Sequence, residues 1–427
     1  MDFDVIVVGA GIAGCVTAYQ LASGGHSVLL VERGAEPGAK NLSGGVLYCR
    51  VMEKVFPGFV DKAPVERRIT RNYLGFLNQD SLVGIDYHDQ RLGQPVNAVS
   101  VLRAKLDAWL AEQCEGAGAV VMPGIKVDSL LSENGQYRGI KAGDDELTAN
   151  VVVLADGVNS FLAREAGLRG KEPLKHLAVG VKSVIGLPAG VIEDRFGVAP
   201  GEGAAYAIVG DCTAGVGGGG FLYTNQESLS IGVVLRLDDL VAKGLGSVEL
   251  HDRFVQHPGI APLLKDGELL EYGCHLVAEG GQAMVHDLAR PGLVVVGDAA
   301  GLTLNTGLTV RGMDLAAASG IAAASAIEDA LADKHFSQAA MDGYVARLNQ
   351  SFAGKDMATY AKAPAFMENP RLFNDYGPLL ANILRGFYNL DTTPREHALP
   401  VVRGALKASG LGLVRLARDG LAGVRAL

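Results

Sequence analysis

The amino-terminal segment has the pattern of a complete strand–helix–strand unit, and this pattern restricts the possible folds more than any other feature. Residues 4–8 form an apolar, largely β-branched run that is typical of a buried parallel strand. A Gly-x-Gly-x-x-Gly motif follows at once and opens a helical segment over residues 12–22. A second apolar strand, residues 27–31, leads directly to Glu32. The pattern predicts a Rossmann-type, nucleotide-binding domain at the start of the chain.

The glycines of the motif have different physical roles. Gly9 permits the tight turn, Gly11 lets a pyrophosphate approach the backbone, and Gly14 lets helix and strand pack closely. The helix that begins at Ile12 and Ala13 offers free N–H groups and the positive end of its dipole to a phosphate. We therefore predict that these five residues bind the dinucleotide.

Glu32 ends the second strand, where an acidic side chain accepts hydrogen bonds from a ribose hydroxyl. Its carboxylate would repel a 2′-phosphate, although Arg33 beside it weakens that inference. The alternative is a glycine-rich turn that binds no nucleotide. The strand, the helix and the acidic residue together argue against that alternative.

Two later apolar strands also end in glycine and an acidic residue, the first in Asp156-Gly157 and the second in Gly297-Asp298. Ligands of open α/β sheets bind at the carboxyl ends of parallel strands, so both pairs are candidate cofactor-binding residues. Asp298 is placed to bind a ribityl or ribose hydroxyl. It could also cap the helix expected after it, and one carboxylate can do both.

The chain of 427 residues is long for a single core, which favours two interleaved domains. Residues 137–147 and 151–155 are each expected to form a strand. Short alternating segments with glycine breaks fill residues 176–273 and predict an antiparallel sheet with a hairpin around residues 224–228, whereas helix dominates towards the end. The expected fold is α/β (α+β overall): a Rossmann-type domain, an inserted antiparallel-sheet substrate domain and a helical C-terminal region. The expected boundaries are 1–75, 101–175 and 281–345 for the first domain, 76–100 and 176–280 for the second, and 346–427 for the helical region.

Composition excludes several classes of function. The net charge is −9 and no dense basic run occurs, so we expect no nucleic-acid partner. The five cysteines are scattered without a Cys-x-x-Cys spacing, which argues against a disulfide framework, a metal site or a built-in iron–sulfur cluster. No segment has the pattern of a signal peptide or of a membrane-spanning helix. The histidines show no ligand spacing and receive no role.

These motifs together resemble the two-domain flavoproteins that include aromatic hydroxylases, geranylgeranyl reductases and electron transfer flavoprotein–quinone oxidoreductases. The shared elements are the glycine motif with Glu32, Arg103 at the start of a helix, and the two acidic strand ends described above. The resemblance implies that the cofactor is FAD, and that Arg103 lies near its diphosphate or adenosine. The alternative for Arg103 is an exposed arginine on a helix surface.

Longer stretches look like the FixC branch of the quinone oxidoreductases, namely residues 38–45, 217–223, 297–312, 360–364 and 416–420. The resemblance implies electron transfer from a reduced electron transfer flavoprotein (FixA with FixB), through FAD, to a membrane quinone. A ferredoxin-like partner, FixX, would take part. The protein would lie on the cytoplasmic face of the membrane as a peripheral protein, and no side chain would be needed as a nucleophile or general base.

By the same resemblance, one loop approaches the flavin ring and the diphosphate. Its residues are Lys40, Asn41, Ser43, Gly44 and Gly45. A cation near the N1–O2 edge of the flavin would stabilise the reduced form. The alternative for Lys40 is a solvated loop charge.

A second loop, at Gly307 and Leu308, would point backbone N–H groups at flavin O2. Arg311 is either a charge that tunes the flavin or a salt-bridge partner at a helix end, and the second is favoured.

Three glycines are candidates for the quinone site. Gly218 and Gly219 match positions that line it in the quinone oxidoreductases, and a β-bulge is an equally good explanation. Gly180 matches another position near the quinone. Ser183 stands where relatives have an acidic residue, which puts a charge-based role there in doubt.

Other functions remain possible on the same scaffold. The main alternative is a geranylgeranyl-reductase-like enzyme that reduces isoprenoid double bonds. An aromatic hydroxylase, or a carrier without FAD, is a weaker alternative.

Residues 404–427 mix apolar and basic residues, so they could form an amphipathic helix on a membrane or a partner. A helix packed on the core is favoured, and Gly410, Gly412 and Gly420 argue against one long helix.

Overall fold

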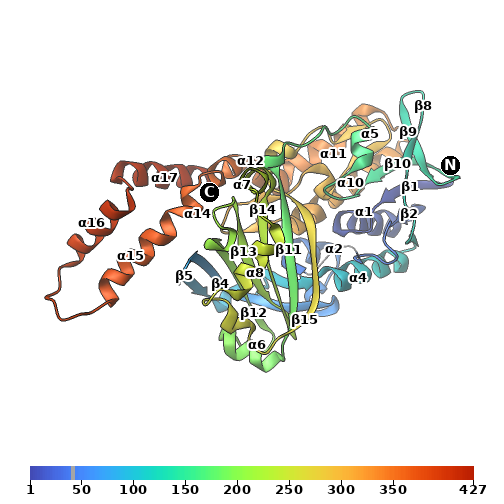
Figure 1. Ribbon diagram of the computed structural model, residues 1–427. Helices are drawn as coiled ribbons and strands as arrows, with labels where there is room; N and C mark the ends of the chain where they lie inside the picture. Colours follow the sequence, from blue (N-terminus) through green and yellow to red (C-terminus); the bar gives the residue numbers. More distant parts are fainter. Residues whose placement is uncertain (40–43) are drawn as a thin grey trace.

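The described residues form two large sheets and a small two-stranded one, β18 (Leu304–Asn305) with β19 (Val310–Arg311). The first large sheet is built from the apolar runs recognised in the sequence (Figure 1). The computed structural model describes residues 1–39 and 44–427. β1 pairs in parallel with β2 and β10, and β10 pairs in parallel with β17. The strands of this sheet, in spatial order, are β16 (Ala289–Arg290), β17 (Leu293–Val295), β10 (Asp145–Leu154), β1 (Phe3–Val8), β2 (Val28–Val31) and β7 (Val120–Met122).

The carboxyl ends of these strands meet at one edge of the sheet. Val7 lies opposite Val153, which in turn lies opposite Val294. The segments that follow β1, β10 and β17 begin at Gly9, Ala155 and Val296, and are therefore neighbours in space. This confirms the prediction that the glycine motif and the two acidic strand ends share one edge.

One part of the sequence interpretation was wrong. Residues 137–147 were expected to form a single strand, but they form parts of two strands, β9 (Gln136–Ala142) and β10, which pair as a hairpin. Gly143, at φ +62, lies in the turn between them. β9 also pairs with β8 (Ser129–Glu133). The buried strand expected at 151–155 is the second half of the long strand β10, which leaves the hairpin and enters the parallel sheet.

The second sheet is mainly antiparallel, and the hairpin expected around residues 224–228 is present between β13 and β14. β12 pairs in parallel with β4, and β5 (Ser81–His88) pairs with the other side of β4. In spatial order the strands are β15 (Glu268–Ala278), β11 (Leu177–Gly186), β14 (Ser228–Arg236), β13 (Gly218–Thr224), β12 (Glu202–Gly210), β4 (Val65–Asn78), β6 (Ala98–Leu102) and β3 (Gly44–Tyr48). Fold class and inserted sheet are thus as expected; the domain boundaries stay a prediction.

Each sheet has its own hydrophobic core. The first core packs the parallel sheet against a group of helices: α1 (Ile12–Ser23), α2 (Arg50–Val55), α3 (Phe59–Lys62), α4 (Arg103–Gly116), α10 (Met313–Ala332), α11 (Gln338–Gln350) and α12 (Phe352–Thr359). The second core lies on one face of the antiparallel sheet. The shorter helices in or near it are α6 (Ala189–Phe196), α7 (Leu237–Lys243), α8 (Ser247–Gln256) and α9 (Ala261–Leu264).

Helix α10 is long and apolar enough to cross a membrane, but 67% of its most apolar window is buried inside the protein. Its alanine-rich sequence packs against α1, and Gly320 lies at the contact beside Ala13, Val16 and Thr17. Thr17 of α1 donates a hydrogen bond to the Gly320 carbonyl at 3.4 Å. We conclude that α10 is a core helix.

The C-terminal region is helical, as predicted, but much of it projects from the body of the molecule (Figure 1). The helices α15 (Tyr376–Tyr388) and α16 (Ala398–Ser409) form a hairpin, and α17 (Leu413–Ala426) follows; α13 (Ala363–Met367) and α14 (Arg371–Asn374) precede them. No residue of α16 is buried. The chain breaks at Gly410, as the glycines indicated, but the favoured packing on the core is wrong for α16.

The contact of α10 with α1 yields a test of the fold. A Cβ at Gly320 would lie 2.7 Å from the Ala13 carbonyl oxygen, which is too close. We expect Gly320→Ala to lower the free energy of unfolding by about 1–3 kcal/mol, because overpacking forces the two helices apart. Gly190→Ala in α6 is the matched control: no atom lies within 4 Å of its Cβ, so stability should stay constant or rise by up to ~1 kcal/mol. Denaturant unfolding measures both, and equal effects would contradict this packing.

Candidate functional site

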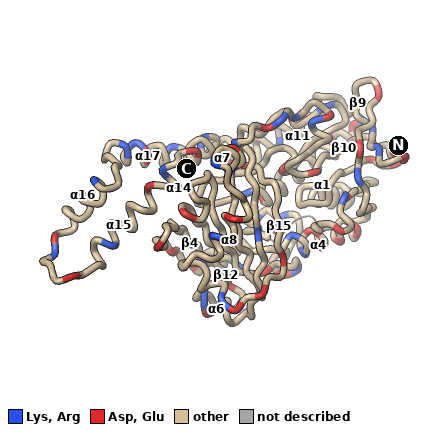
Figure 2. The backbone as a smooth tube through the Cα atoms, in the orientation of Figure 1, with Lys and Arg blue, Asp and Glu red and all other residues tan. Residues whose placement is uncertain are grey.

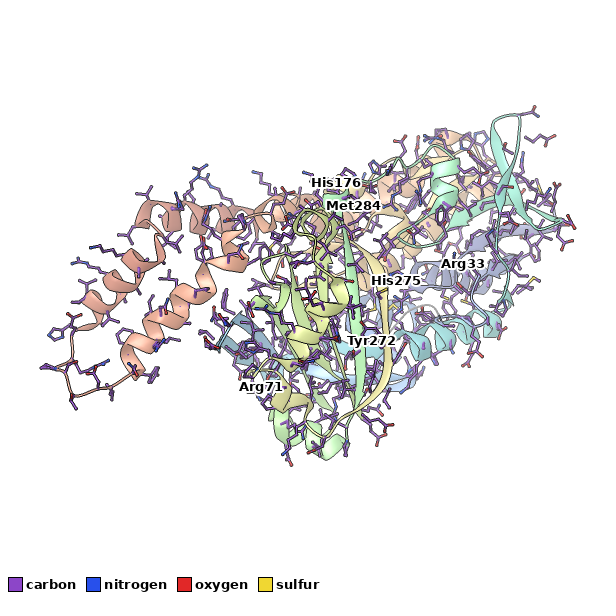
Figure 3. The ribbon with its side chains drawn as sticks, viewed as in Figure 1. Arg33, Arg71, His176, Tyr272, His275 and Met284 are labelled. Carbon is purple, nitrogen blue, oxygen red and sulfur yellow. The ribbon has the colours of Figure 1, made fainter. Side chains whose placement is uncertain are left out.

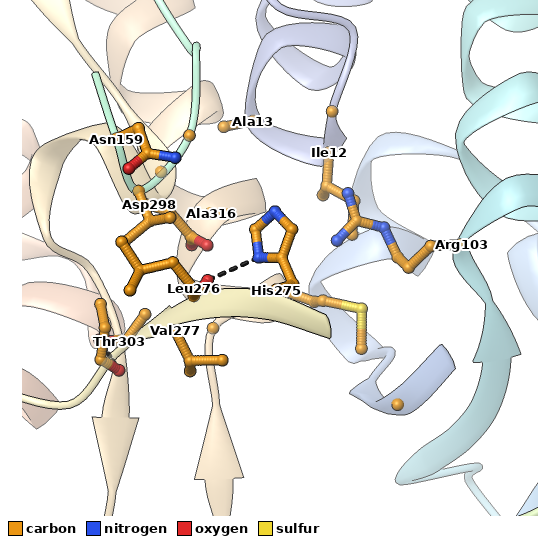
Figure 4. Close-up of a pocket in the computed structure, with 18 of the residues that line it drawn as sticks. Ile12, Ala13, Arg103, Asn159, His275, Leu276, Val277, Asp298, Thr303 and Ala316 are labelled. Carbon is orange, nitrogen blue, oxygen red and sulfur yellow. Dashed lines mark hydrogen bonds between the residues drawn. The ribbon is translucent and has the colours of Figure 1, made fainter. Parts of the chain in front are cut away.

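A cavity of about 810 Å³ lies between the two large sheets. Figure 4 shows part of its lining. One end is lined by the glycine loop after β1 and by the segments that follow β2, β10 and β17. The other end is lined by one face of β11, β13, β14 and β15. The ends of the parallel strands therefore form the floor of the cavity, and the antiparallel sheet forms a wall.

The glycine loop has the geometry that its sequence predicts. Gly9 has φ +108, and a Cβ there would overlap the Ala155 carbonyl. A Cβ at Gly14 would overlap the Gly9 carbonyl, so the start of α1 packs directly on the strand end. A Cβ at Gly11 would be 3.6 Å from its nearest neighbour, Nη2 of Arg103. The backbone at Gly11 is therefore open towards the cavity. With Ile12 and Ala13 it presents the first N–H groups of α1 beside that space.

Glu32 is fixed by two backbone N–H groups. Its Oε2 accepts a hydrogen bond from the Ala10 N–H at 3.1 Å, and its Oε1 accepts one from the Gly34 N–H at 2.6 Å. The carboxylate also lines the cavity, so its remaining lone pairs are available to a hydroxyl. Arg33 is exposed beside it and lines the same end (Figure 3).

Arg103 lies at the first turn of α4 and faces the glycine loop across the cavity. Asp107, one turn later and fully buried, accepts two hydrogen bonds from its guanidinium, both at 2.8 Å. This bidentate pair fixes the side chain and leaves one edge of the guanidinium towards Gly11. The alternative of an exposed surface arginine is therefore wrong.

The acidic residues at the two strand ends have different environments. The Asp156 carboxylate accepts a hydrogen bond from Ser160 at 2.7 Å, which ties it to its own loop. The Asp298 carboxylate lines the cavity together with His275 (Figure 4). Burial raises the pKa of Asp298, while the charge of Arg103 opposes the shift. Asp298 caps no helix here, because Val296 precedes a short 3₁₀ helix, Gly297–Ala300, without a side-chain cap.

Gly157 and Gly297 have positive φ angles of +79 and +63. Gly297 donates its N–H to Ser319 Oγ at 2.9 Å, and a Cβ there would lie 2.9 Å from the Ala13 Cβ. The end of β17 is therefore held against α1 and α10. Both glycines line the cavity.

A buried arginine that the sequence analysis missed joins the two acidic loops. Arg169 Nη1 donates to the carbonyl of Val158 at 2.9 Å and to that of Ala299 at 3.4 Å. Glu172 accepts from Arg169 Nε at 3.1 Å, and His286 and His176 surround the same carboxylate at 2.8 and 3.5 Å. Two of the histidines thus have a structural position. Because these contacts join residues far apart in the chain, no local pattern predicts them.

The loop at Gly307 differs in one respect from the expectation. The Gly307 N–H donates to Asn305 Oδ1 at 2.8 Å, so it is not free for flavin O2. Gly307 lines the cavity, whereas the Leu308 side chain is exposed. Asn305 Nδ2 in turn donates to Glu279 at 3.1 Å, and burial raises the pKa of that glutamate. The loop is therefore held by the second sheet through its own side chains.

The candidate quinone residues are only partly brought together. Gly218 and Gly219 line the cavity, but β13 runs in regular register there, so a bulge does not explain them. A Cβ at Gly219 would lie 2.7 Å from the Ile208 carbonyl oxygen. Gly180 is not among the described residues that line the cavity. The side chain of Lys182 covers it, since Cε of Lys182 would lie 3.5 Å from a Cβ at Gly180. Ser183 points to the other face and bonds to His251 at 3.0 Å.

The remaining candidates are two glycines of β3, Arg311 and three residues that precede β3 in the sequence. Gly44 and Gly45 line the cavity, but they belong to strand β3 rather than to a loop. Arg311 pairs with Asp314 and Asp356, each at 2.6 Å, so the favoured salt-bridge assignment is confirmed. Lys40, Asn41 and Ser43 lie outside the described residues.

Four side chains of the wall were also missed by the sequence analysis: Lys182, Tyr223, His275 and Glu279. The signal that could have found Lys182 is the two-residue period of a strand, since it shares a face with the candidate Gly180. Burial raises the pKa of Tyr223, which stacks on Phe221 with ring centroids 5.0 Å apart.

Two family models and several curated proteins match the chain. Residues 4–74 match a family model described as FAD dependent oxidoreductase, and residues 363–427 match one described as ETF-QO/FixC family C-terminal domain. The chain is 46% identical to the probable electron transfer flavoprotein-quinone oxidoreductase YdiS of Escherichia coli strain K12, over 100% of this chain and 99% of that protein. It is 44% identical to protein FixC of Salmonella typhimurium, with the same coverage.

Solved structures support the fold alone. A geranylgeranyl bacteriochlorophyll reductase-like protein from Thermoplasma acidophilum matches with a TM-score of 0.69 and 21% identity, over 98% of each chain. A myxobacterial FAD-dependent chondrochloren halogenase matches with a TM-score of 0.63 and 19% identity, over 96% of this chain and 97% of that one.

The cofactor is FAD, and the cavity residues fit it. The open backbone at Gly11 beside Arg103 suits a diphosphate, the fixed carboxylate of Glu32 suits a ribose, and Asp298 suits a hydroxyl of the ribityl chain. These individual assignments remain proposals.

The position of Glu32 yields a test of the adenosine end. In Glu32→Gln the amide can accept from only one of the Ala10 and Gly34 N–H groups, and the charged acceptor for ribose is lost. Since a hydrogen bond to a charged group contributes about 1.5–3 kcal/mol, we expect the Kd for FAD to rise roughly tenfold or more. Titration of the deflavinated protein by flavin fluorescence measures it. Glu36→Gln, exposed in the same loop, should bind like the wild type; equal Kd values for all three would exclude Glu32 from the site.

Proposed function

Because the chain belongs to the electron transfer flavoprotein–quinone oxidoreductase/FixC family of FAD-dependent oxidoreductases, we propose that it passes electrons from a reduced electron transfer flavoprotein of the FixA/FixB type to a membrane quinone. A ferredoxin-like partner of the FixX type takes part in this transfer. The observation that carries the proposal is identity along the full length with a relative named for this activity, together with the family match of residues 363–427.

The cavity suits such a relay in physical terms. Bound FAD can take up or release one or two electrons, which couples one-electron carriers to a two-electron acceptor. The protein then has to bind the cofactor, exclude water and offer the acceptor a fitting wall. The antiparallel-sheet end of the cavity has an apolar and aromatic surface, which is formed by Phe221, Tyr223 and the backbone of Gly219.

The proposal predicts which donors reduce the protein. Under anaerobic conditions, a reduced electron transfer flavoprotein of the FixA/FixB type should bleach the flavin absorbance, whereas NADH and NADPH should leave it oxidised. Stopped-flow absorbance of the FAD-loaded protein measures both. Reduction by a nicotinamide at a catalytic rate would contradict the proposed electron source and favour a geranylgeranyl-reductase-like or hydroxylase activity.

A membrane quinone requires contact with a membrane, and we assign that contact to α15, α16 and α17. Exposed apolar side chains occur along all three; they include Leu399, Leu413, Val414, Leu421 and Val424. Residues 376–427 contain seven arginines and lysines against three acidic residues, although the whole chain is negative (Figure 2). An apolar surface with a local excess of positive charge suits an anionic lipid surface.

Helix α17 is held at one side and free at the other. Asp419 is buried and accepts hydrogen bonds from Arg371 and Tyr376. The distance from Nη2 of Arg371 to Oδ1 of Asp419 is 2.7 Å. Val414 and Val424, by contrast, are 85% and 82% exposed. The Asp419 contacts therefore dock α17 on the body while its apolar side chains stay accessible to lipid.

The assignment predicts binding to anionic vesicles. Phosphatidylcholine vesicles with about a third phosphatidylglycerol should carry the protein to the top of a flotation gradient, because apolar burial and charge attraction add. The double variant Val414→Asp/Val424→Asp should stay at the bottom. Val241→Asp, an exposed apolar residue of α7, is the control and should float like the wild type. Equal flotation of all three, or none, would contradict the assignment.

A further inference from the structure

Lys182 is a charged residue in the wall of the cavity. The other residues of its strand, β11, are small or apolar. It lies on β11 between Val181, which faces the second core, and Ser183, which bonds to His251 on α8. Side chains alternate between the faces of a strand, so Lys182 faces the cavity instead. It is one of the residues that line it.

The neighbouring strands leave space for this side chain. Lys182 lies opposite Gly232 of β14 and opposite Gly273 of β15, neither of which has a side chain. Gly232 in turn lies opposite Phe221, whose ring would be only 2.8 Å from a Cβ at Gly232. The Phe221 ring therefore lies over Gly232, and the Lys182 ammonium is 5.7 Å from the ring centroid. At this distance the ring face attracts the cation.

The ammonium has no ion-pair or hydrogen-bond partner within residues 1–39 and 44–427. Charged groups on two other elements act on it from a distance: Arg103 of α4 and Glu271 of β15, an exposed residue. The titratable side chains of the same wall are Tyr223, His275 and Glu279. A buried cation without a partner is costly, which indicates a site for an electron-rich group from a ligand.

We propose that Lys182 donates a hydrogen bond, and then a proton, to an oxygen of the quinone that accepts electrons in this cavity. The inference rests on the proposed function, because it concerns the acceptor. The geometry favours the acceptor over the cofactor, since Lys182 lies beside Phe221 in the wall of the second sheet. The glycine loop and the acidic strand ends, in contrast, belong to the first sheet.

The proton balance of the step is complete. Reduction of a quinone to a quinol needs two electrons and two protons. The electrons come from the reduced cofactor. One N–H bond of the Lys182 ammonium breaks as one O–H bond forms on the quinone oxygen, and the neutral amine recovers its proton from water. Solvent supplies the second proton and takes up the proton that the reduced cofactor loses on oxidation.

The titration of Lys182 sets the expected pH dependence. Burial and, to a lesser extent, the charge of Arg103 lower the pKa of Lys182 to about 8, while the charge of Glu271 opposes the shift. Below that pH the ammonium is present, and above it the proton is lost. The rate of quinone reduction should therefore fall as the pH rises through about 8.

The test follows oxidation of the FAD-loaded, dithionite-reduced protein by ubiquinone-1, so that no protein partner is needed. Lys182→Met should reduce ubiquinone-1 about 10²-fold more slowly and without the fall near pH 8, since a positioned acid contributes this much. Lys182→Arg keeps the charge but gives up a proton poorly. It should bind ubiquinone-1 as the wild type does, yet turn over slowly and without the fall near pH 8.

Two controls separate the acceptor from the cofactor. Ferricenium takes an electron without a proton, so Lys182→Met should reduce it at the wild-type rate and should keep the wild-type midpoint potential of FAD. Lys54→Met, an exposed lysine of α2, should behave as the wild type with both oxidants. Equal slowing with ferricenium, or a shifted potential, would place Lys182 at the cofactor and overturn the inference.

The outcomes distinguish the inference from the proposed function. If the wild type reduces ubiquinone-1 and Lys182→Met does so at the same rate and with the same pH profile, the inference is wrong and the proposed function stands. If the wild type reduces ferricenium but neither ubiquinone-1 nor menadione, the proposed function fails, and the inference fails with it.

Discussion

The site depends on the buried guanidinium of Arg169. Its hydrogen bonds hold together two loops that are distant in the chain, at one edge of the parallel sheet. The guanidinium bonds to the carbonyls of Val158 and Ala299, which follow β10 and β17, and Glu172 neutralises its charge. Parallel pairing brings the strand ends together, but the loops beyond them are irregular and need side-chain contacts. With the glycine loop fixed by close packing on Ala155, all segments of the cavity floor have defined positions.

Side chains alternate between the two faces of the second sheet, so each face has a different role. One face carries the apolar residues that pack on α6 and α8, while the other face forms the cavity wall. Glycines and larger side chains occur side by side in the wall: Gly219 and Gly232 have no side chain, while Lys182 and Phe221 extend from the neighbouring positions. A planar ligand can therefore lie close to the backbone and still meet a cation.

The sequence predicted what depends on neighbouring residues. The glycine loop, Glu32 and the strand-end acids were found because a strand, a turn and a helix leave a local pattern. Arg169 was missed because its contacts join loops that lie far apart in the chain. Lys182 was missed although the two-residue period of a strand places it on the same face as Gly180. The expectation for the Gly307 N–H differed for a local reason, because Asn305, only two residues earlier, accepts its hydrogen bond. The exposed hairpin of α15 and α16 also needed the structure, because amphipathic helices of the core and of a membrane surface share one pattern.

The central claim is that FAD lies along the cavity floor, from Glu32 past Gly11 to Asp298, and faces the wall formed by Lys182 and Phe221. A crystal structure of the FAD-loaded protein tests it most directly. The account predicts a ribose hydroxyl on Glu32, the diphosphate beside Gly11 and Arg103, and a flavin ring whose exposed face is turned to the second sheet. A flavin ring that points away from this sheet, or an adenosine that leaves Glu32 without contact, would contradict the account.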